Sequence, residues 1–177
     1  MKVTDLKIHQ VDASPKGNWI FVEVETDAGI KGIGEASQSG NDRLVIAILE
    51  QMAERLRGVD PTQVEVVWEQ MARSGNIFSG GSGRVGATAV SAVDQALWDI
   101  AGKALDVPVW RLLGGKRREK VRVYANLSRG TRDRTPQGFA DAAMRAVDAG
   151  FTSVKSTPFD EVNWRNSDHS GGESDAD

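Results

Sequence analysis

Lys155 is the residue whose type and position most favour chemistry in this sequence. It follows the stretch "FTSV" (Phe151–Val154), which the pattern predicts to be a short buried strand after a helix that ends near Gly150. In a parallel barrel, residues at the carboxyl ends of the strands face the active site. A lysine there would be partly desolvated, which lowers its pKa and suits it to proton abstraction or anion binding. An ordinary surface lysine at a strand end is the alternative.

A glycine-rich loop, Ser74–Gly86, is the second candidate. It contains the spacing G-x-G-x-x-G from Gly81 to Gly86, and Asp106 follows about 20 residues later. A dinucleotide-binding fingerprint needs a strand immediately before these glycines, inside a βαβ unit. A helix is predicted there instead, which argues against dinucleotide binding. The loop then either joins two helices or forms a flap over a neighbouring active site.

The other charged and titratable groups favour structural roles. His9 and His169 have no partner at metal-ligand spacing. Asp94 and Asp99 are five residues apart on one helix and therefore on different faces, which favours salt bridges or interface contacts over paired acid–base work. Five positive charges surround Glu119 in "GGKRREKVR", and no interleaved aromatic residues accompany them. That segment indicates a solvated connection between domains rather than a nucleic-acid site.

Composition indicates a globular protein with no general attraction to nucleic acid or membranes. Of the 177 residues, 40% are hydrophobic and 27% charged, and the net charge is −3. The absence of cysteine excludes disulfides and thiolate metal sites. The N-terminus lacks the apolar core of a signal peptide, and no apolar run approaches the roughly 20 residues that span a bilayer. A cytoplasmic location is therefore expected.

Three strands are predicted at the N-terminus as an antiparallel meander. They cover Val3–Val11, Trp19–Thr26 and Ile30–Ala36, and the second alternates cleanly between apolar and polar residues. Pro15, Gly17 and Asn18 between the first two strands predict a flexible loop.

Three helices are predicted next. Asn41 or Asp42 caps the first, which ends at Gly58, and Asp60-Pro61 provides an N-cap and N1 pair for the second. The third covers Ala87–Leu105. A short helical turn in "VPVWRLLGG" follows. The predicted apolar faces are Leu44, Val45, Ile48, Leu49, Met52 and Leu56; Val64, Val67, Trp68 and Met71; and Val90, Val93, Leu97, Ile100 and Ala101.

The pattern after residue 115 changes to strand, helix, strand. Lys120–Asn126 and "FTSVK" are the strands, and the helix between them begins at Thr135-Pro136 and ends before Gly150. Its predicted apolar face is Phe139, Ala143, Met144 and Val147. This order implies a parallel pair. The sequence therefore predicts an α+β domain over 1–115, the start of an α/β unit with one βαβ motif over 116–159, and a disordered acidic tail over 160–177.

Several quoted segments together resemble one family. "SAVDQALWDIAGKALDVPVWRLLGG" (Ser91–Gly115) is similar to the end of the N-terminal capping domain of the enolase superfamily, in its mandelate racemase and muconate-lactonizing branch. "GIGEAS" (Gly32–Ser37) resembles the third strand of that domain. "VRVYAN" and "AGFTSVK" resemble the first two barrel strands. The resemblance covers about residues 1–160.

The resemblance implies a fold and a chemistry. The fold is an α+β capping domain, a three-stranded antiparallel meander plus helices, followed by an incomplete (β/α) barrel start. Members abstract a proton alpha to a carboxylate, and Mg²⁺ stabilises the enediolate. The substrate would be a small carboxylate or sugar acid, and the full-length enzyme would form a homo-oligomer.

The resemblance also implies site residues. The second barrel strand of the family often ends in Lys-x-Lys, and here Lys155 matches the position that contacts the substrate carboxylate. Thr157 stands where the basic lysine would be and cannot serve as that base, although it could contact substrate. With the following "PFDEV", this favours an acid-sugar dehydratase over an epimerase or cycloisomerase. Trp19 and Phe78 lie in the two loops that cover the site in relatives and are expected to contact substrate.

The part of the family that carries the metal ligands and the histidine base is not found in the sequence. A complete barrel takes about 250 residues, and 57 remain from Val121 onward. We therefore expect a truncated or frameshifted chain, inactive alone, that binds no Mg²⁺ itself. Two alternatives remain: a stand-alone capping-domain protein that binds a partner chain, and a fragment of a racemase or cycloisomerase.

Overall fold

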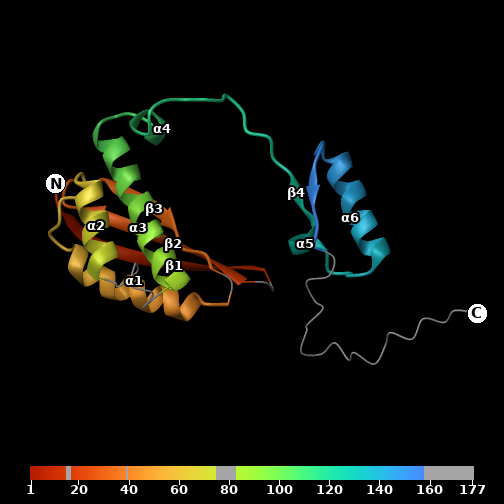
Figure 1. The fold of residues 1–177 in the computed structure, drawn as a ribbon, viewed down its shortest axis with the longest axis horizontal. Coiled ribbons are helices and arrows are strands. Elements are labelled where there is room, and N and C mark those ends of the chain that lie inside the picture. Colours follow the sequence, from red (N-terminus) through yellow and green to blue (C-terminus); the bar gives the residue numbers. More distant parts are fainter. Residues whose placement is uncertain (15–16, 39, 75–82, 158–177) are drawn as a thin grey trace, which may run out of the picture. The chain divides into compact units, whose positions relative to one another are not determined.

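The computed structural model describes residues 1–14, 17–38, 40–74 and 83–157. They belong to two compact units, Met1–Arg117 and Arg118–Asp177, which Figure 1 shows in ribbon form. The predicted fold class is confirmed: unit 1 holds a three-stranded antiparallel sheet with helices, and unit 2 holds a short parallel pair with a helix. The predicted tail, residues 160–177, lies outside the described residues. Within the described residues, no helix is long and apolar enough to cross a membrane.

The sheet of unit 1 has the order β1-β2-β3, with β1 at Val3–Ser14, β2 at Gly17–Thr26 and β3 at Lys31–Glu35. The alternation in β2 gives it one buried face, where Ile20, Val22 and Val24 are fully buried. Of the residues predicted to form a loop here, Pro15 lies outside the described residues and the other two lie in a strand. Ser14 pairs with Gly17, and Gly17 and Asn18 belong to β2, because the glycine adopts a φ of 140°.

Three helices follow the sheet: α1 (Asp42–Leu56), α2 (Val64–Ser74) and α3 (Gly83–Ala104). Helices α1 and α3 pack against the strands, and α2 packs against α3. Figure 1 shows them together on one face of the sheet. They enclose one continuous apolar core. Its fully buried side chains include Ile20, Val22, Val24, Val45, Leu49, Val93, Leu97 and Ile100.

The start of α2 differs from its prediction. Asp60 does not cap a helix, and α2 begins at Val64. The Asp60 carboxylate accepts hydrogen bonds from the backbone N–H and the hydroxyl of Thr62, at 3.0 and 2.7 Å, which makes a local turn instead. These two bonds lower the pKa of Asp60.

The start of α3 and the apolar faces of α1 and α2 also differ from the sequence prediction. Helix α3 begins at Gly83, so the end of the glycine-rich segment is helical. Leu44 is 58% exposed and Trp68 36%, so neither belongs to the buried face that the pattern predicted for its helix.

Close approach of α3 to β3 depends on two glycines. A Cβ at Gly32 would overlap the carbonyl oxygen of Ala96, and a Cβ at Gly34 would overlap that of Ala92. Because glycine has no Cβ, the helix can lie directly against the edge strand.

Polar side chains of α3 also bond to the outer edge of β3. Asp99 accepts from the Ile33 N–H at 3.0 Å, Gln95 accepts from the Glu35 N–H at 3.1 Å, and Lys103 donates to the Lys31 carbonyl at 2.6 Å. We call these three contacts the edge ladder. An unpaired strand edge is a template for association with other chains. The edge ladder occupies that edge from within the chain.

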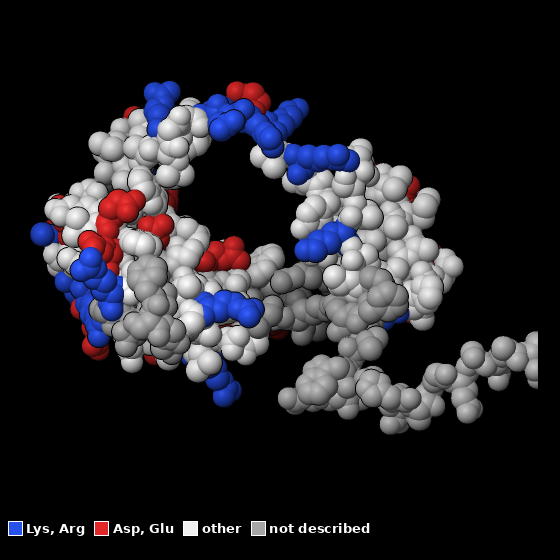
Figure 2. Space-filling view, viewed as in Figure 1, with Lys and Arg blue, Asp and Glu red and all other residues white. Residues whose placement is uncertain are grey.

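Unit 1 ends with α4 (Val109–Leu112), after which Gly114 and Gly115 have φ values of 98° and 111°. Residues 115–124 form neither helix nor strand, so the strand predicted from Lys120 is far shorter than expected. Residues 113–124 are exposed, and Figure 2 shows Lys and Arg side chains gathered over this segment. The interpretation of the basic cluster as a solvated connection agrees with this exposure.

Unit 2 contains β4 (Ala125–Asn126), α5 (Leu127–Gly130), α6 (Pro136–Asp148) and β5 (Val154–Lys155). The strands pair in parallel, as predicted. Helix α6 has the predicted ends: the Thr135 hydroxyl accepts from the Gly138 N–H at 3.1 Å, and Gly150 has a φ of 86°. Its buried face differs, because Ala142 and Ala146 are buried whereas Met144 and Val147 are exposed.

Candidate functional site

Lys155 lies at the carboxyl end of β5, as predicted, and pairs in register with Asn126 at the end of β4. Ala125 packs with the small apolar cluster formed with α6. Because side chains alternate along a strand, Asn126 and its partner Lys155 face away from that helix. The Lys155 Nζ lies 5.8 Å from the centroid of the Tyr124 ring, a cation–π distance. These three residues bring a cation, an amide and a phenol to one side of the parallel pair.

Lys155 is exposed in this structure, so the predicted partial desolvation is wrong for the chain as described. Val154 beside it is 47% exposed, and the strand is two residues long. A strand with only one neighbour does not bury the side chains at its end. What the arrangement provides is a hydrated cation with an aromatic neighbour, which suits the binding of an anion.

Thr157 is held by Ser128 and Arg134. Its backbone N–H and its hydroxyl both donate to the Ser128 Oγ, at 2.6 and 2.7 Å. Arg134 donates to the carbonyl oxygens of Ser128 at 2.9 Å and Thr157 at 3.2 Å. Arg134 also lies 4.8 Å from the Phe139 ring centroid. The segment after Lys155 is therefore tied to the segment after Asn126, although the two are far apart in sequence.

Helix α5, which carries Ser128, was not predicted. The Asn126 side chain accepts from the Ser128 N–H at 3.2 Å and caps the helix. An asparagine at the last position of a predicted strand is a capping signal that could have indicated this turn.

The arrangement can bind a carboxylate, but it holds no metal centre. In the described ranges, no three or more His, Asp or Glu side chains come together in a way that could hold a metal ion. The described residues therefore do not fit a magnesium site. What they offer is the Lys155 cation, the Asn126 amide and the Tyr124 hydroxyl.

Trp19, the predicted substrate contact in unit 1, lies in β2 and is 47% exposed. Its ring meets that of Phe21 edge to face, with centroids 6.4 Å apart. The neighbouring Asn18 donates to the Asp42 carboxylate at 2.9 Å. Phe78 lies outside the described residues.

The remaining candidates have structural surroundings. Asp99 forms a salt bridge with Lys103 at 2.7 Å, as its helical position predicted. Burial, together with the nearby charge of Glu65, raises the pKa of Asp94. His9 is exposed on β1, and His169 lies outside the described residues. Helix α2 precedes the glycine-rich segment, which agrees with the argument against a dinucleotide site.

Comparison with known proteins places these features in one family. Residues 6–114 match the N-terminal domain of the mandelate racemase / muconate lactonizing enzyme family. The D-galactonate dehydratase of Verminephrobacter eiseniae is 40% identical over 162 residues, which cover 92% of this chain and 40% of that protein. The D-galactonate dehydratase of Klebsiella pneumoniae is 40% identical over 125 residues, 71% of this chain and 31% of that protein.

A solved structure agrees with the sequence relatives. A member of the enolase superfamily from Salmonella Typhimurium superposes with a TM-score of 0.74 at 34% identity and covers 86% of this chain and 41% of that one. The chain thus spans about 40% of the length of the curated relatives that match most of it.

Proposed function

The chain belongs to the mandelate racemase / muconate lactonizing enzyme family of the enolase superfamily, and from that premise we propose that it provides the capping domain and first barrel strands of an acid-sugar dehydratase. The single observation that carries the proposal is Lys155 at the carboxyl end of a parallel strand, register-paired with Asn126. The names of the relatives, D-galactonate dehydratases, support a sugar acid as the substrate class.

Lys155 would bind the substrate carboxylate in this proposal. An ammonium group gives a carboxylate a charge-assisted hydrogen bond, the stronger class of hydrogen bond in proteins. Asn126 and Tyr124 would fix the position of the bound carboxylate beside it. The polarity of these groups and the place of Lys155 and Asn126 at the strand ends support this role.

Thr157 would orient the segment that follows Lys155 rather than move a proton. Its hydroxyl already donates to Ser128, and a threonine is too weak a base to abstract a proton alpha to a carboxylate. The described residues supply neither that base nor a metal site. Proton removal at C2 with loss of hydroxide from C3 would yield an enol, which becomes a 2-keto-3-deoxy acid.

The two predicted domains have separate roles in this proposal. Residues 1–115 would cap the active site, with Trp19 and Phe78 in contact with substrate, and residues 116–159 would begin the barrel. The assembled enzyme would be a homo-oligomer.

A chimera tests the proposal. Residues 1–157 of this chain would replace the matching part of the Verminephrobacter eiseniae D-galactonate dehydratase, and formation of the keto acid from D-galactonate would be followed with semicarbazide. Because a hydrogen bond to a charged group contributes about 1.5–3 kcal/mol, we expect Lys155→Ala to lower kcat/KM about 10- to 100-fold. Lys155→Arg should recover part of this loss.

Lys120→Ala is the matched control, since Lys120 is exposed in the connecting segment. It should leave kcat/KM within about twofold of the chimera, an ordinary surface effect. A folded chimera whose Lys155→Ala variant keeps full kcat/KM would contradict the role of Lys155. A folded chimera that dehydrates no sugar acid would contradict the assignment of this chain to the dehydratases.

A further inference from the structure

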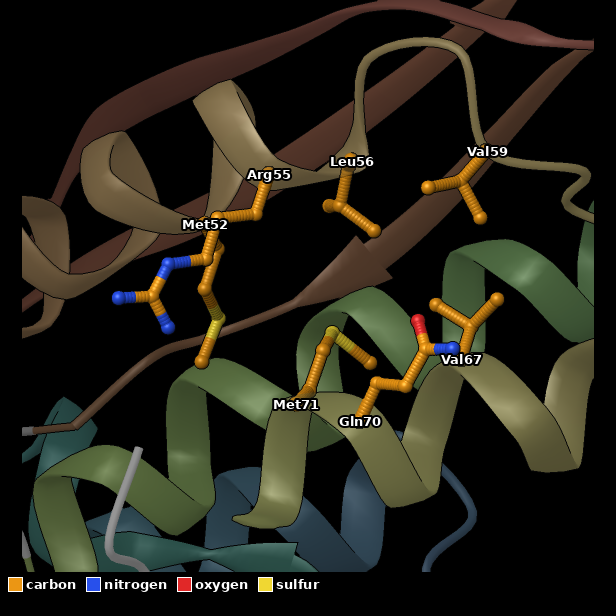
Figure 3. Close-up of a pocket in the computed structure, with 7 residues that line it drawn as sticks. All are labelled: Met52, Arg55, Leu56, Val59, Val67, Gln70 and Met71. Atoms are coloured by element: carbon orange, nitrogen blue, oxygen red, sulfur yellow. The ribbon is translucent and has the colours of Figure 1, made fainter. Parts of the chain in front are cut away.

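We propose that a pocket between α1 and α2 is a binding site for a small aliphatic carboxylate. The pocket has a volume of about 170 Å³ and lies entirely within unit 1. It shares no residue with the Lys155 site. Its lining residues, labelled in Figure 3, are Met52, Arg55, Leu56, Val59, Val67, Gln70 and Met71.

The floor of the pocket is apolar. Met52 and Leu56 of α1 and Val67 and Met71 of α2 are buried, and each contributes to the main core of unit 1. Figure 3 shows Leu56 and Val59 on one side of the space, and Val67 and Met71 on the other. Unbranched methionine side chains adapt to the shape of a guest. The floor would therefore receive a flexible hydrocarbon chain.

The rim of the pocket is polar and carries a positive charge. Arg55 and Gln70 are exposed and come from the two opposite helices. Figure 3 shows the Gln70 amide projecting from α2 toward the space between the helices. No ion pair or hydrogen bond of Arg55 occurs within the described residues. Arg57, two residues later, is by contrast paired with Asp5 at 3.0 Å.

An apolar floor with an unpaired guanidinium at its edge, beyond Met52 (Figure 3), defines the chemistry of the ligand. The guanidinium prefers a carboxylate, to which it can donate two parallel hydrogen bonds. An apolar protein cavity of about 150 Å³ holds a guest of about six carbons. A linear monocarboxylate of about that length, such as hexanoate, matches both the volume and the charge. Because the pocket is small and open at its rim, we expect a dissociation constant of about 1 mM.

Methyl NMR of the full 177-residue chain tests this binding. The chain has four methionines, Met1, Met52, Met71 and Met144, so ¹³C-methyl labelling places two probes in the pocket and two outside it. Sodium hexanoate would be titrated at constant pH and ionic strength. The Met52 and Met71 methyl signals should shift and saturate together, whereas those of Met1 and Met144 should stay in place.

Three variants and one neutral ligand separate the contribution of the Arg55 charge to binding from that of the apolar pocket. Arg55→Gln should raise the dissociation constant at least fivefold, and Arg43→Gln, an exposed arginine elsewhere on α1, should leave it unchanged. 1-Hexanol should bind at least fivefold more weakly than hexanoate. Val59→Phe, which fills the pocket from the connection between the helices, should abolish saturation.

Several results would overturn the proposal. One is the absence of saturable shifts at Met52 and Met71. Another is equal affinity of the Arg55→Gln variant, which would mean that the charge takes no part. A third is movement of the same two signals on dilution without hexanoate, because that would identify the pocket as an interface between copies of the chain.

Discussion

Glu25 is a carboxylate whose pKa is strongly lowered by ion pairs across the sheet. It accepts from Lys31 at 2.6 Å and from Lys7 at 2.7 Å, and Lys31 also pairs with Glu23 at 3.1 Å. The hydrogen bonds from Lys31 and Lys7 lower the pKa of Glu25 from 4.5 to about 2. The hydrogen bond from Lys31 to Glu25, and to a smaller extent the one to Glu23, raises the pKa of Lys31. One carboxylate thus links all three strands of the sheet.

The lowered pKa of Glu25 predicts the direction of a pH effect on stability. A carboxylate whose pKa is lower in the folded state stabilises the fold fully above its ordinary value of 4.5. That contribution disappears as the pH falls toward about 2. In urea titrations, Glu25→Gln should therefore be less stable than the natural chain at pH 7, and the two should converge between pH 4.5 and 2. Glu54→Gln, at an exposed position of α1, is the control. A difference that persists at pH 2 would contradict the ion-pair explanation.

Gly34 allows a second prediction, because an added methyl group would meet backbone. The Cβ of an alanine there would overlap the Ala92 carbonyl, and α3 would have to move away from β3. Overpacking of this kind costs about 1–3 kcal/mol, so we expect Gly34→Ala to lower the free energy of unfolding by about 2–3 kcal/mol in urea. Gly130→Ala is the matched control, since no atom lies within 4 Å of the added Cβ. Equal stability of both variants would show that α3 shifts at little cost.

Single residues of the candidate site could be predicted only in part. Lys155 was found because a lysine after an apolar run has a recognisable sequence pattern. The surroundings of Lys155 were not predictable, since the pairing of Asn126 with Lys155 and the bonds from Thr157 to Ser128 depend on strand register and tertiary contact. The exposure of Lys155 likewise depends on what lies beside its strand.

At the scale of elements, the edge ladder is possible because four residues of a helix and two residues of a strand advance by similar distances. Gln95, Asp99 and Lys103 are spaced four residues apart along α3, and their partners in β3 are spaced two residues apart. Four helical residues rise about 6 Å, and two strand residues about 6.8 Å, so both series advance nearly together. A helix laid along a strand edge can therefore bond to it repeatedly. The sequence shows the helical spacing but not the strand that it meets.

Removing the middle contact of the edge ladder should weaken the edge strand. Asp99→Ala deletes the acceptor of the Ile33 N–H and the partner of Lys103. We expect a loss of about 1 kcal/mol in unfolding free energy, the usual value of one hydrogen bond. Amide exchange at Ile33 should also become faster. Asp99→Asn keeps an oxygen acceptor and should retain most of the protection, and Glu54→Ala controls for a change of charge. Unchanged exchange at Ile33 in Asp99→Ala would show that the contact does not protect the edge.

Two Xaa-Pro pairs show why one helix start was predicted correctly and another was not. Thr135-Pro136 begins α6 as expected, because the threonine hydroxyl accepts from the Gly138 N–H. Asp60-Pro61 has the same form, yet α2 begins at Val64. The Asp60 carboxylate is already engaged by Thr62, which supplies two donors. Short polar side chains offer the backbone alternatives to helix, and the sequence pattern alone does not rank them.

At the scale of the whole molecule, the two units differ in the size of their apolar cores. Among the described residues, the unit 1 cluster has 21 buried members, and that of unit 2 has three: Leu127, Ala142 and Ala146. Since apolar burial is the main source of stability, we expect unit 1 to be the more stable unit. Amide exchange should accordingly be slowest in β2 and α3 and faster in α6.

Limited trypsin digestion tests this difference in stability between the units, because the segment that joins them contains cleavage sites. Residues 113–124 are exposed, and Lys116, Arg117, Arg118, Lys120 and Arg122 provide cleavage sites there. The first cut should fall in this segment and release a fragment near residues 1–117 that still unfolds cooperatively on heating, because its core is complete. Changing Lys116, Arg117 and Arg118 to glutamine should slow that cut and leave the thermal midpoint unchanged. An equally early cut after Lys103, inside α3, would show that unit 1 opens as readily as unit 2 and that core size does not decide which unit is more stable.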